Sequence, residues 1–268
     1  MKVAIKTHNR VNVLKTHTLA MLDRNDIHQN DVYLFVSSEQ QRDIYSAGIP
    51  EFAGNIVLCP ETGARGAAKH IQGYFPPGTD VIHCDDDIRE LVTVDKFNEV
   101  SGRKWIEVKT LPALAAQGFA KCREHKTVLW GVNPVWNRLC LRNTLTTSLA
   151  FIWAGCYGFI AESNPPEITV KIKDDFERSI AVYLNYGAVV RFNYVCCRTR
   201  TGRDGEGANT TSAVTEKLHL DDVMYLHKKY PFLVQLHKKK TFGGVDIRLR
   251  DMRKRQVGVI GQASLWND

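Results

Sequence analysis

The chain has 268 residues, which is enough for one large domain or two small ones with a substantial core. Hydrophobic residues make up 44% and charged residues 24%, the balance of an ordinary globular protein. No apolar run reaches the roughly 18 residues that a membrane-spanning helix needs, and residues 1–5 predict a strand rather than a signal peptide. These properties argue against a membrane-spanning or secreted protein, and we expect a cytoplasmic one.

Seven cysteines are scattered along the chain, and none forms a Cys-x-x-Cys pair. An odd number without regular spacing predicts free thiols in a reducing compartment and argues against structural zinc. The net charge of +7 is uneven, because residues 226–255 carry ten Lys or Arg and two Asp or Glu. Such a basic block is typical of segments that bind a polyanion such as DNA, although a solvated surface explains it equally well.

The first 90 residues alternate predicted strands and helices. Alternation with short connections predicts parallel strands joined by right-handed crossovers. Ligands of such sheets bind beyond the carboxyl ends of the strands, so residues 7–10, 37–39 and 85–87 should lie close together. The expected strands are 3–6, 32–36, 56–58 and 81–84, and the expected helices are 11–24, 39–47 and 63–72.

Beyond residue 90 the pattern is less regular. We expect two strands around a Ser101-Gly102 loop in residues 91–109, and an aperiodic loop at 199–212. Because there is no internal repeat and no low-complexity linker, the chain is predicted to form one continuous domain. Further strands are expected at 128–132, 150–153, 158–161 and 189–195, and further helices at 112–124, 174–186 and 215–229.

Three adjacent carboxylates, Asp85, Asp86 and Asp87, follow the apolar strand "VIHC". Asp87 with Glu90 would fit a capping box at the start of a helix, but that leaves the other two acids unexplained. Within the stretch, only Arg89 could offset their repulsion. A divalent cation accounts for all three, since Mg²⁺ and Mn²⁺ prefer oxygen ligands, and Mg²⁺ completes its shell with phosphate oxygens and water. The pattern therefore favours a metal–diphosphate site.

A second acidic pair, Asp174 and Asp175, opens the predicted helix 174–186. Asp174 as N-cap with Glu177 three residues later fits a capping box. Asp175 is not needed for that cap, although an acid at this point also favours the helix dipole. The residues alone leave both the structural and the functional interpretation open.

The N-terminal segments "VAIKTHNR", "VYLFVSS" with Glu39, "GARGAAKHI" and "VIHCDDDI" together resemble a GT-A glycosyltransferase. The resemblance covers residues 1–90, and more weakly 128–195. Within that fold, "WGVNPVWN" and "KDDFERSIAVYLNYGAVVRFNYVC" resemble the phage and protist enzymes that glycosylate 5-hydroxymethylpyrimidines in DNA, related to the base J glucosyltransferase.

The resemblance implies an α/β, Rossmann-like mixed sheet flanked by helices in a single catalytic domain. Residues 1–90 would bind the nucleotide sugar, 91–225 the acceptor, and 226–268 would form a basic C-terminal segment that contacts DNA. The implied donor is a UDP-sugar with Mn²⁺ or Mg²⁺. The protein would work in the cytoplasm, which is the host's if a phage encodes it.

The resemblance also implies roles for individual residues. Glu39 would face the uracil or ribose, and Asp85 would bind the ribose. Arg65 and Lys69 would reach the diphosphate, although a solvated helix face explains them as well. The implied cofactor-binding residues are Thr7, Asn9, Arg10, Glu39, Arg65, Lys69, Asp85 and Asp86, and the implied metal ligands are Asp87 and Asp85.

In inverting GT-A enzymes an acidic pair opens a helix after the acceptor-side strands, and its second member is the general base. The match gives that role to Asp175 and leaves Asp174 as the other candidate. An acceptor hydroxyl is a weak nucleophile at neutral pH, and a carboxylate that takes its proton as the new bond forms would activate it. With no covalent intermediate, the anomeric centre is expected to invert.

The sequence does not decide which molecule accepts the sugar. Trp130, Trp136, Trp153 and Tyr157 could stack on a base or a sugar, or pack in the core. A polysaccharide or protein acceptor is the first alternative to DNA. Two further alternatives are a nucleotidyltransferase, although "KTHNRVN" lacks the expected glycine-rich loop, and a non-catalytic nucleic-acid-binding module.

Overall fold

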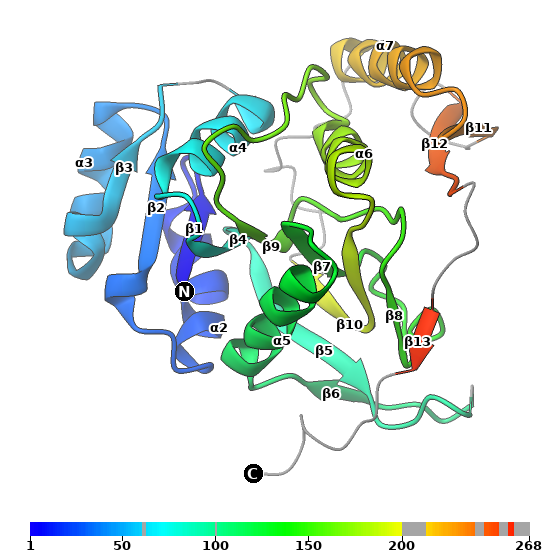
Figure 1. Ribbon diagram of the computed structural model, residues 1–268. Helices are drawn as coiled ribbons and strands as arrows, with labels where there is room; N and C mark the ends of the chain where they lie inside the picture. Colours follow the sequence, from blue (N-terminus) through cyan, green and yellow to red (C-terminus); the bar gives the residue numbers. More distant parts are fainter. Residues whose placement is uncertain (61–62, 100, 200–212, 239–243, 252–256, 260–268) are drawn as a thin grey trace.

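The computed structural model describes residues 1–60, 63–99, 101–199, 213–238, 244–251 and 257–259. In these residues a mixed sheet of eleven strands has helices on both faces, and a separate two-stranded sheet lies beside α7 (Figure 1). The strands of the large sheet are β1 (Lys2–Lys6), β2 (Val32–Val36), β3 (Ile56–Leu58), β4 (Asp80–Asp85), β5 (Ile88–Val94), β6 (Trp105–Glu107), β7 (Leu129–Asn133), β8 (Thr144–Thr146), β9 (Cys156–Ile160), β10 (Val190–Thr199) and β13 (Val257–Val259).

The small sheet pairs β11 (Val234–Lys238) with β12 (Val245–Leu249) in antiparallel fashion. Short 3₁₀ turns occupy Gln29–Asp31 and Pro50–Asn55. The helical segments are α1 (Val11–Leu14), the π-helical turn η1 (Lys15–Leu19), α2 (Ala20–Asp23), α3 (Glu39–Gly48), α4 (Gly63–Tyr74), α5 (Leu111–Glu124), α6 (Asp174–Tyr186) and α7 (Ala213–Lys229).

Strand direction sets the edge of the sheet at which a site can form. The order across the sheet is β3–β2–β1–β4–β9–β7–β10–β8–β13, and the first four strands are parallel, as predicted. β9 runs against both β4 and β7, so β7 has the same direction as β4. The carboxyl ends of β1, β4 and β7 therefore share one edge, where Lys6 is the register partner of Asp85.

The two faces of the sheet are buried by different helices. Strand residues alternate between the faces, so that Ile5 packs on one side and Ala4 on the other. The first core contains Leu14, Met21, Tyr45, Leu114 and Phe119 from α1, α2, α3 and α5. The second contains Ile71, Ile180, Tyr183, Val223 and Leu226 from α4, α6 and α7, and Phe75, which directly follows α4.

Most predicted elements are present, and helix α6 ends at Gly187, whose φ of +77° suits glycine. The predicted strand at 150–153 is wrong. Its backbone groups bind side chains instead of a neighbouring strand, since Ile152 N donates to Ser179 Oγ at 2.9 Å. The helix predicted to stop at Gly73 continues to Tyr74. Strands β8, β11, β12 and β13 are not foreseen by the sequence analysis.

Some expectations fall on residues outside those described. The predicted loop at 199–212 is described only at Thr199, the last residue of β10. In the basic C-terminal segment, residues 239–243, 252–256 and 260–268 also lie outside the described part of the chain.

Candidate active site

The acidic triplet forms the turn between β4 and β5. Asp85 ends β4, and Ile88 begins a strand that runs antiparallel to β10. The capping-box alternative for Asp87 is therefore wrong, because no helix starts there. Thr18 fastens this turn from the π-helical segment: its Oγ1 donates to Asp85 O at 2.7 Å and accepts from Ile88 N at 2.9 Å.

Basic side chains from the end of β1 meet the three carboxylates. Arg10 contacts Asp86 Oδ1 at 2.8 Å and Asp87 Oδ2 at 3.4 Å through its two terminal nitrogens. Lys6 Nζ lies 3.3 Å from Asp85 Oδ1. Neither partner lies within residues 81–90, where Arg89 is the only lysine or arginine. Charge repulsion alone consequently does not require a metal ion here.

Thr7 and Asp86 are buried together behind Arg10. Thr7 Oγ1 donates to Asp86 Oδ2 at 2.8 Å and shares a hydrogen bond with Tyr45 Oη at 2.5 Å. Burial raises the pKa of Asp86 to about 6, against the opposing effects of the Thr7 hydrogen bond and the Arg10 charge. Asn9, whose φ is +54°, is held by Gln41, which binds both its backbone N and its side-chain oxygen.

Asp85 retains an oxygen that suits a cation. Its Oδ1 is buried and accepts no hydrogen bond from any described residue, although the Lys6 ammonium lies nearby. The described residues contain no group of three or more His, Cys, Asp or Glu that could hold a metal ion. A divalent ion held here by Asp85 and Asp87 would need oxygens of a bound substrate to complete its shell.

The second acidic pair occupies the first two positions of α6, whereas the capping interpretation put Asp174 at the N-cap. Lys173 is the N-cap and makes no side-chain capping bond with the described first turn, so the N-cap interpretation of Asp174 is wrong. Asp174 is buried, and its Oδ2 lies 4.0 Å from Arg178 Nη1 without a hydrogen bond from any described residue. Burial and the Asp174 charge raise the pKa of Asp175 to about 7, although Arg178 and Lys173 oppose them.

Lys6 brings the two acidic sites together. Burial disfavours its ammonium, but the charges of Asp85 and Asp174 raise its pKa above the ordinary value. A stack of side chains spans the same space from β4 to α6. His83 stacks on Tyr157 at a centroid distance of 4.9 Å, and the Arg178 guanidinium lies 4.0 Å from the Tyr157 ring. The carboxyl edge of the sheet therefore gathers both acidic motifs around Lys6, a partly buried cation.

Three predicted residues lie away from this centre. Glu39 is exposed at the start of α3 and pairs with Arg42. Arg65, on the exposed face of α4, donates to Thr169 O at 2.7 Å, in the segment that precedes α6. Lys69 is exposed one turn further along α4. The structure thus joins Thr7, Arg10, Asp86 and Asp87 directly, whereas Arg65 contacts the segment before α6.

The sequence analysis missed several residues of the site. Lys6 is the register partner of Asp85, and its signal was a lysine at the end of the apolar strand "VAI". Tyr45, Gln41 and Thr18 act from helices, and no local pattern marks them. Glu177 was considered only as part of a cap, yet it is fully buried.

The aromatic candidates divide between core and surface. Trp130 and Tyr157 are fully buried, and Gly158 leaves room for the Trp130 indole, since a Cβ there would lie 2.0 Å from Nε1. Trp136 is 42% exposed in the loop after β7. Its ring stacks on that of Trp105 at a centroid distance of 6.1 Å, and the Arg198 guanidinium carbon lies 5.2 Å from the Trp136 ring centroid.

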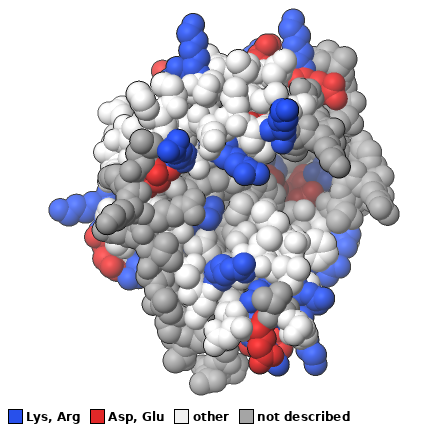
Figure 2. All heavy atoms as spheres, turned by 90° about the vertical axis from the view of Figure 1, so that its right-hand side faces the viewer, with Lys and Arg blue, Asp and Glu red and all other residues white. Residues whose placement is uncertain are grey.

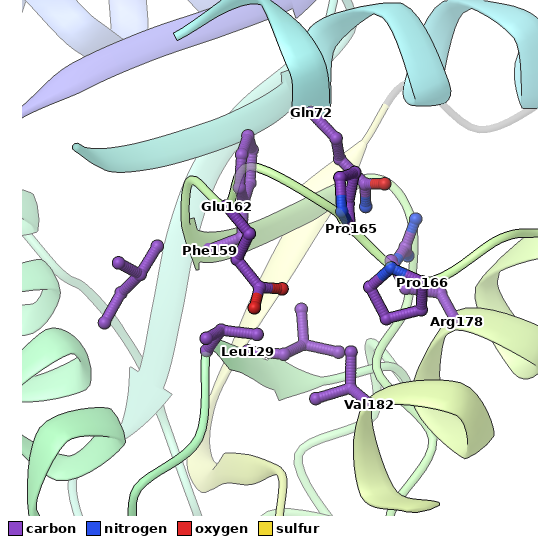
Figure 3. A pocket seen from close by; sticks show the side chains of 10 residues that line it. Gln72, Leu129, Phe159, Glu162, Pro165, Pro166, Arg178 and Val182 are labelled. Atoms are coloured by element: carbon purple, nitrogen blue, oxygen red, sulfur yellow. The ribbon is translucent and has the colours of Figure 1, made fainter. Parts of the chain in front are cut away.

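A small cavity borders the site without being part of it (Figure 3). Its volume is about 20 Å³, and Arg178 forms part of its wall. A space of that size holds one water molecule and no substrate. It is lined by Gln72, Val128, Leu129, Phe159, Ile160, Glu162, Pro165, Pro166, Arg178 and Val182.

In the basic segment at residues 226–255, the acidic side chains contact the rest of the fold and the described Lys and Arg side chains are exposed to solvent. On the side shown in Figure 2, Lys and Arg side chains stand at separate points among uncharged atoms. Its two acids point inward: Asp246 pairs with Lys173 at 2.7 Å, and Asp251 accepts from Tyr183 Oη at 2.7 Å. The basic residues of the segment that are described are all exposed, namely Lys228, Lys229, Lys238, Arg248 and Arg250. No helix among the described residues is long and apolar enough to cross a membrane.

Known structures share this architecture. The chain is similar to residues 1–349 of TarS from S. aureus, with a TM-score of 0.50 and 12% identity over 87% of this chain and 72% of that one. The same fragment in complex with UDP has a TM-score of 0.49 and 14% identity, with the same coverage of both chains. The mannosyltransferase PcManGT from Pyrobaculum calidifontis, in complex with GDP-Man and Mn²⁺, gives 0.36 at 11% identity over 59% of this chain and 44% of that one. The sequence matches no protein-family model and no curated protein.

The likeness to TarS concerns the fold. A mostly parallel sheet flanked by helices, with one reversed strand between β4 and β7, is the predicted GT-A-like arrangement, and the predicted fold class is confirmed. The predicted DNA-modifying subgroup is not tested by this likeness.

Proposed function

We propose that the protein is a metal-dependent, inverting glycosyltransferase that moves a sugar from a UDP-sugar to a hydroxyl group, with 5-hydroxymethylpyrimidine in DNA as the acceptor. One observation carries the proposal: the turn at Asp85–Asp87 and the first turn of α6 converge around Lys6 at the carboxyl edge of a GT-A-like sheet. Ligands of open α/β sheets bind at that edge. The division into residues 1–90 for the donor and 91–225 for the acceptor belongs to the same proposal.

The donor half supplies charge and hydrogen bonds for a nucleotide diphosphate. Arg10 and Lys6 place two cations beside the carboxylates, and Thr7 and Asn9 line the same strand end. Glu39, Arg65 and Lys69 would approach the donor from α3 and α4. A divalent ion held by Asp85 and Asp87 would offset the negative charge that builds on the leaving diphosphate.

The acceptor half supplies the base. Asp175 has a pKa near 7, which suits a group that must take a proton near neutral pH. As the acceptor oxygen bonds to the anomeric carbon, the hydroxyl proton passes to Asp175, and the bond between sugar and diphosphate breaks. Asp174 would orient this step through its charge. The anomeric configuration inverts because a single displacement takes place.

Two features support DNA as the acceptor. Lys228, Lys238, Arg248 and Arg250 are exposed and can bind phosphates, and such binding weakens steeply with salt. Trp136 is exposed at the start of the loop that follows β7, whose carboxyl end lies at the edge of the site. An exposed indole offers a stacking surface for a base or a sugar.

One assay tests the proposal. The protein is incubated with Mn²⁺ or Mg²⁺, labelled UDP-sugars, and DNA that contains 5-hydroxymethylcytosine or 5-hydroxymethyluracil. Label in the DNA is the expected result. Release of UDP without label in DNA would keep the glycosyltransferase and reject the acceptor. DNA binding without any UDP release or transfer would reject the enzyme altogether.

A further inference from the structure

The segment of residues 169–173, which leads into α6, is held by two carboxylates. Glu177 Oε2 accepts from the backbone N–H groups of residues 169 and 170, at 2.6 and 3.0 Å. Asp222 Oδ2 accepts from the next three, residues 171, 172 and 173, at 2.9, 2.7 and 3.2 Å. Five consecutive N–H groups thus point at two anions. We call Glu177 and Asp222 the acidic clamp.

Both members of the clamp are buried. Glu177 is fully buried on α6 itself, and its Oε1 receives Lys229 Nζ at 2.8 Å. Asp222 is 7% exposed and comes from α7, nearly fifty residues further along the chain. Hydrogen bonds to an ionised acceptor are about twice as strong as those between neutral groups, so the clamp fixes this backbone tightly.

The position of the clamp matters because α6 has no side-chain cap of its own among the described residues. Asp174 and Asp175 are the first two residues of the helix, and they directly follow the clamped segment. Two further contacts fix the segment: Arg65 donates to Thr169 O at 2.7 Å, and Asp246 binds Lys173. The location of the acidic pair thus depends on α4, α7 and β12 rather than on the helix alone.

We propose that Glu177 and Asp222 are positioning residues, which hold the 169–173 segment so that the Asp175 carboxylate stays within reach of the acceptor hydroxyl. The inference rests on the proposed function, in which Asp175 is the general base. A misplacement of a reacting group by about 1 Å can cost on the order of a hundredfold in rate. The clamp therefore acts on turnover through Asp175 and leaves the donor site at Asp85–Asp87 intact.

The test compares Asp222→Ala and Asp222→Asn with Asp221→Asn, a matched control on the exposed neighbouring residue of α7. Hydrogen exchange of the amides of 171–173 measures the clamp directly. Turnover at saturating donor and acceptor, the KM for the UDP-sugar and the Kd for UDP measure its effect on the reaction. A second variant, Glu177→Gln, should loosen the amides of 169 and 170 instead, which separates the two halves of the clamp.

In Asp222→Ala we expect faster exchange at 171–173, a kcat lower by roughly 10- to 100-fold, and donor KM and UDP Kd within about twofold of wild type. Asp222→Asn, which keeps an oxygen acceptor, should recover part of the turnover, and Asp221→Asn should match wild type. If amide hydrogen exchange at residues 171–173 is unchanged in Asp222→Ala, Asp222 does not hold this backbone and the clamp is rejected. Faster exchange with normal kcat overturns the positioning role. If wild type transfers no sugar to any acceptor, the proposed function fails and the positioning role with it, while the exchange data still report whether the clamp exists.

Discussion

The two acidic motifs of the candidate site are held in opposite ways. In the turn at Asp85–Asp87, other side chains bind the carboxylates themselves: Asp86 accepts from Arg10 with one oxygen and from Thr7 with the other. Before the start of α6, Glu177 and Asp222 instead accept hydrogen bonds from the backbone. Asp174 has a buried oxygen to which no described residue donates a hydrogen bond. A cation-paired carboxylate suits the binding of charge, whereas Asp175, whose pKa burial and the Asp174 charge raise to about 7, suits the uptake of a proton.

The difference also separates the motif that we expect to stabilise the fold from the one that the proposed reaction would use. Removing a partner from the first motif leaves a buried charge unpaired, so the cost falls on stability and donor binding. Removing an acid from the second motif relieves repulsion between Asp174 and Asp175, so its cost falls on turnover. Variants of the two motifs should therefore fail in different assays.

The largest effect is expected for Asp175→Asn. The amide cannot accept the acceptor's proton, so kcat should fall by roughly 10²- to 10⁴-fold. Binding of UDP, measured by calorimetry, should stay as in wild type because the donor side is untouched. Asp174→Asn serves as the comparison and should retain more activity. Wild-type turnover in Asp175→Asn, together with a loss in Asp174→Asn, would move the base to Asp174.

Arg10→Met should have the next largest effect, this time on stability. Asp86 is 5% exposed, and its ion pair with Arg10 is lost. Breaking a buried pair costs about 3 kcal/mol, measured as a change in the free energy of unfolding in denaturant. Because Asp86 has a pKa of about 6, it is ionised above pH 6 and becomes neutral below it. The loss should therefore be greatest above pH 6 and shrink as the pH falls.

Arg42→Met is the matched control, since it removes an exposed pair with Glu39. Such pairs contribute roughly 0–1 kcal/mol, so its unfolding curve should nearly overlay that of wild type. Equal destabilisation by the two variants would mean that Arg10 does not stabilise the turn in the way described.

The sequence predicted that the first acidic motif lies at the ends of neighbouring parallel strands, and it predicted the helix that the second motif opens. The parallel strands were readable because "VAIK", "VYLFV" and "VIHC" are apolar runs with short connections, and parallel strands bring their ends together. Lys6 and Arg10 were read as strand-end residues but not as partners of Asp85 and Asp86. Strand register sets Lys6 beside Asp85, and the segment between β1 and α1 brings Arg10 to Asp86. No local pattern in the sequence reports either pairing.

The second motif was harder to read for another physical reason. The capping box of Asp174 with Glu177 and the acidic pair of Asp174 with Asp175 share Asp174, so the sequence fitted a cap that the fold does not use. Asp222 contributes from a helix that begins at Ala213, and its role depends on how α7 packs against α6. Long-range contacts of this kind carry no signature in one sequence.

Glu39→Gln probes a residue on the donor side that the resemblance singled out and that the structure leaves exposed. A hydrogen bond between its carboxylate and the ribose or uracil would be charge-assisted, so its loss should weaken UDP binding about tenfold. Calorimetric titration with UDP measures this. The unfolding free energy should be unchanged, since the side chain is on the surface. An unchanged Kd would remove Glu39 from the donor site and leave it as a partner of Arg42.

The smallest effect is a displaced pH profile in Lys173→Met. In wild type, the rate of transfer should rise with pH through about 7, because Asp175 must lose its proton before it can act as a base. Burial and Asp174 raise the pKa of Asp175, while the charge of Lys173 lowers it. Without that charge the pKa rises further, so the inflection moves to higher pH by a fraction of a unit. The rate below neutrality falls relative to the alkaline plateau. The plateau itself can also fall, because Lys173 pairs with Asp246, so the position of the inflection is the quantity that reports the pKa.

Lys171→Met is the matched control for this shift, because it removes an exposed lysine from the same segment. Lys173→Arg keeps the charge and should restore the wild-type profile. A profile that moves to lower pH in Lys173→Met, or that moves equally in Lys171→Met, would mean that the titrating group is not Asp175. The second acidic motif would then have to be reassigned from proton uptake to charge binding, and the contrast between the two motifs would disappear.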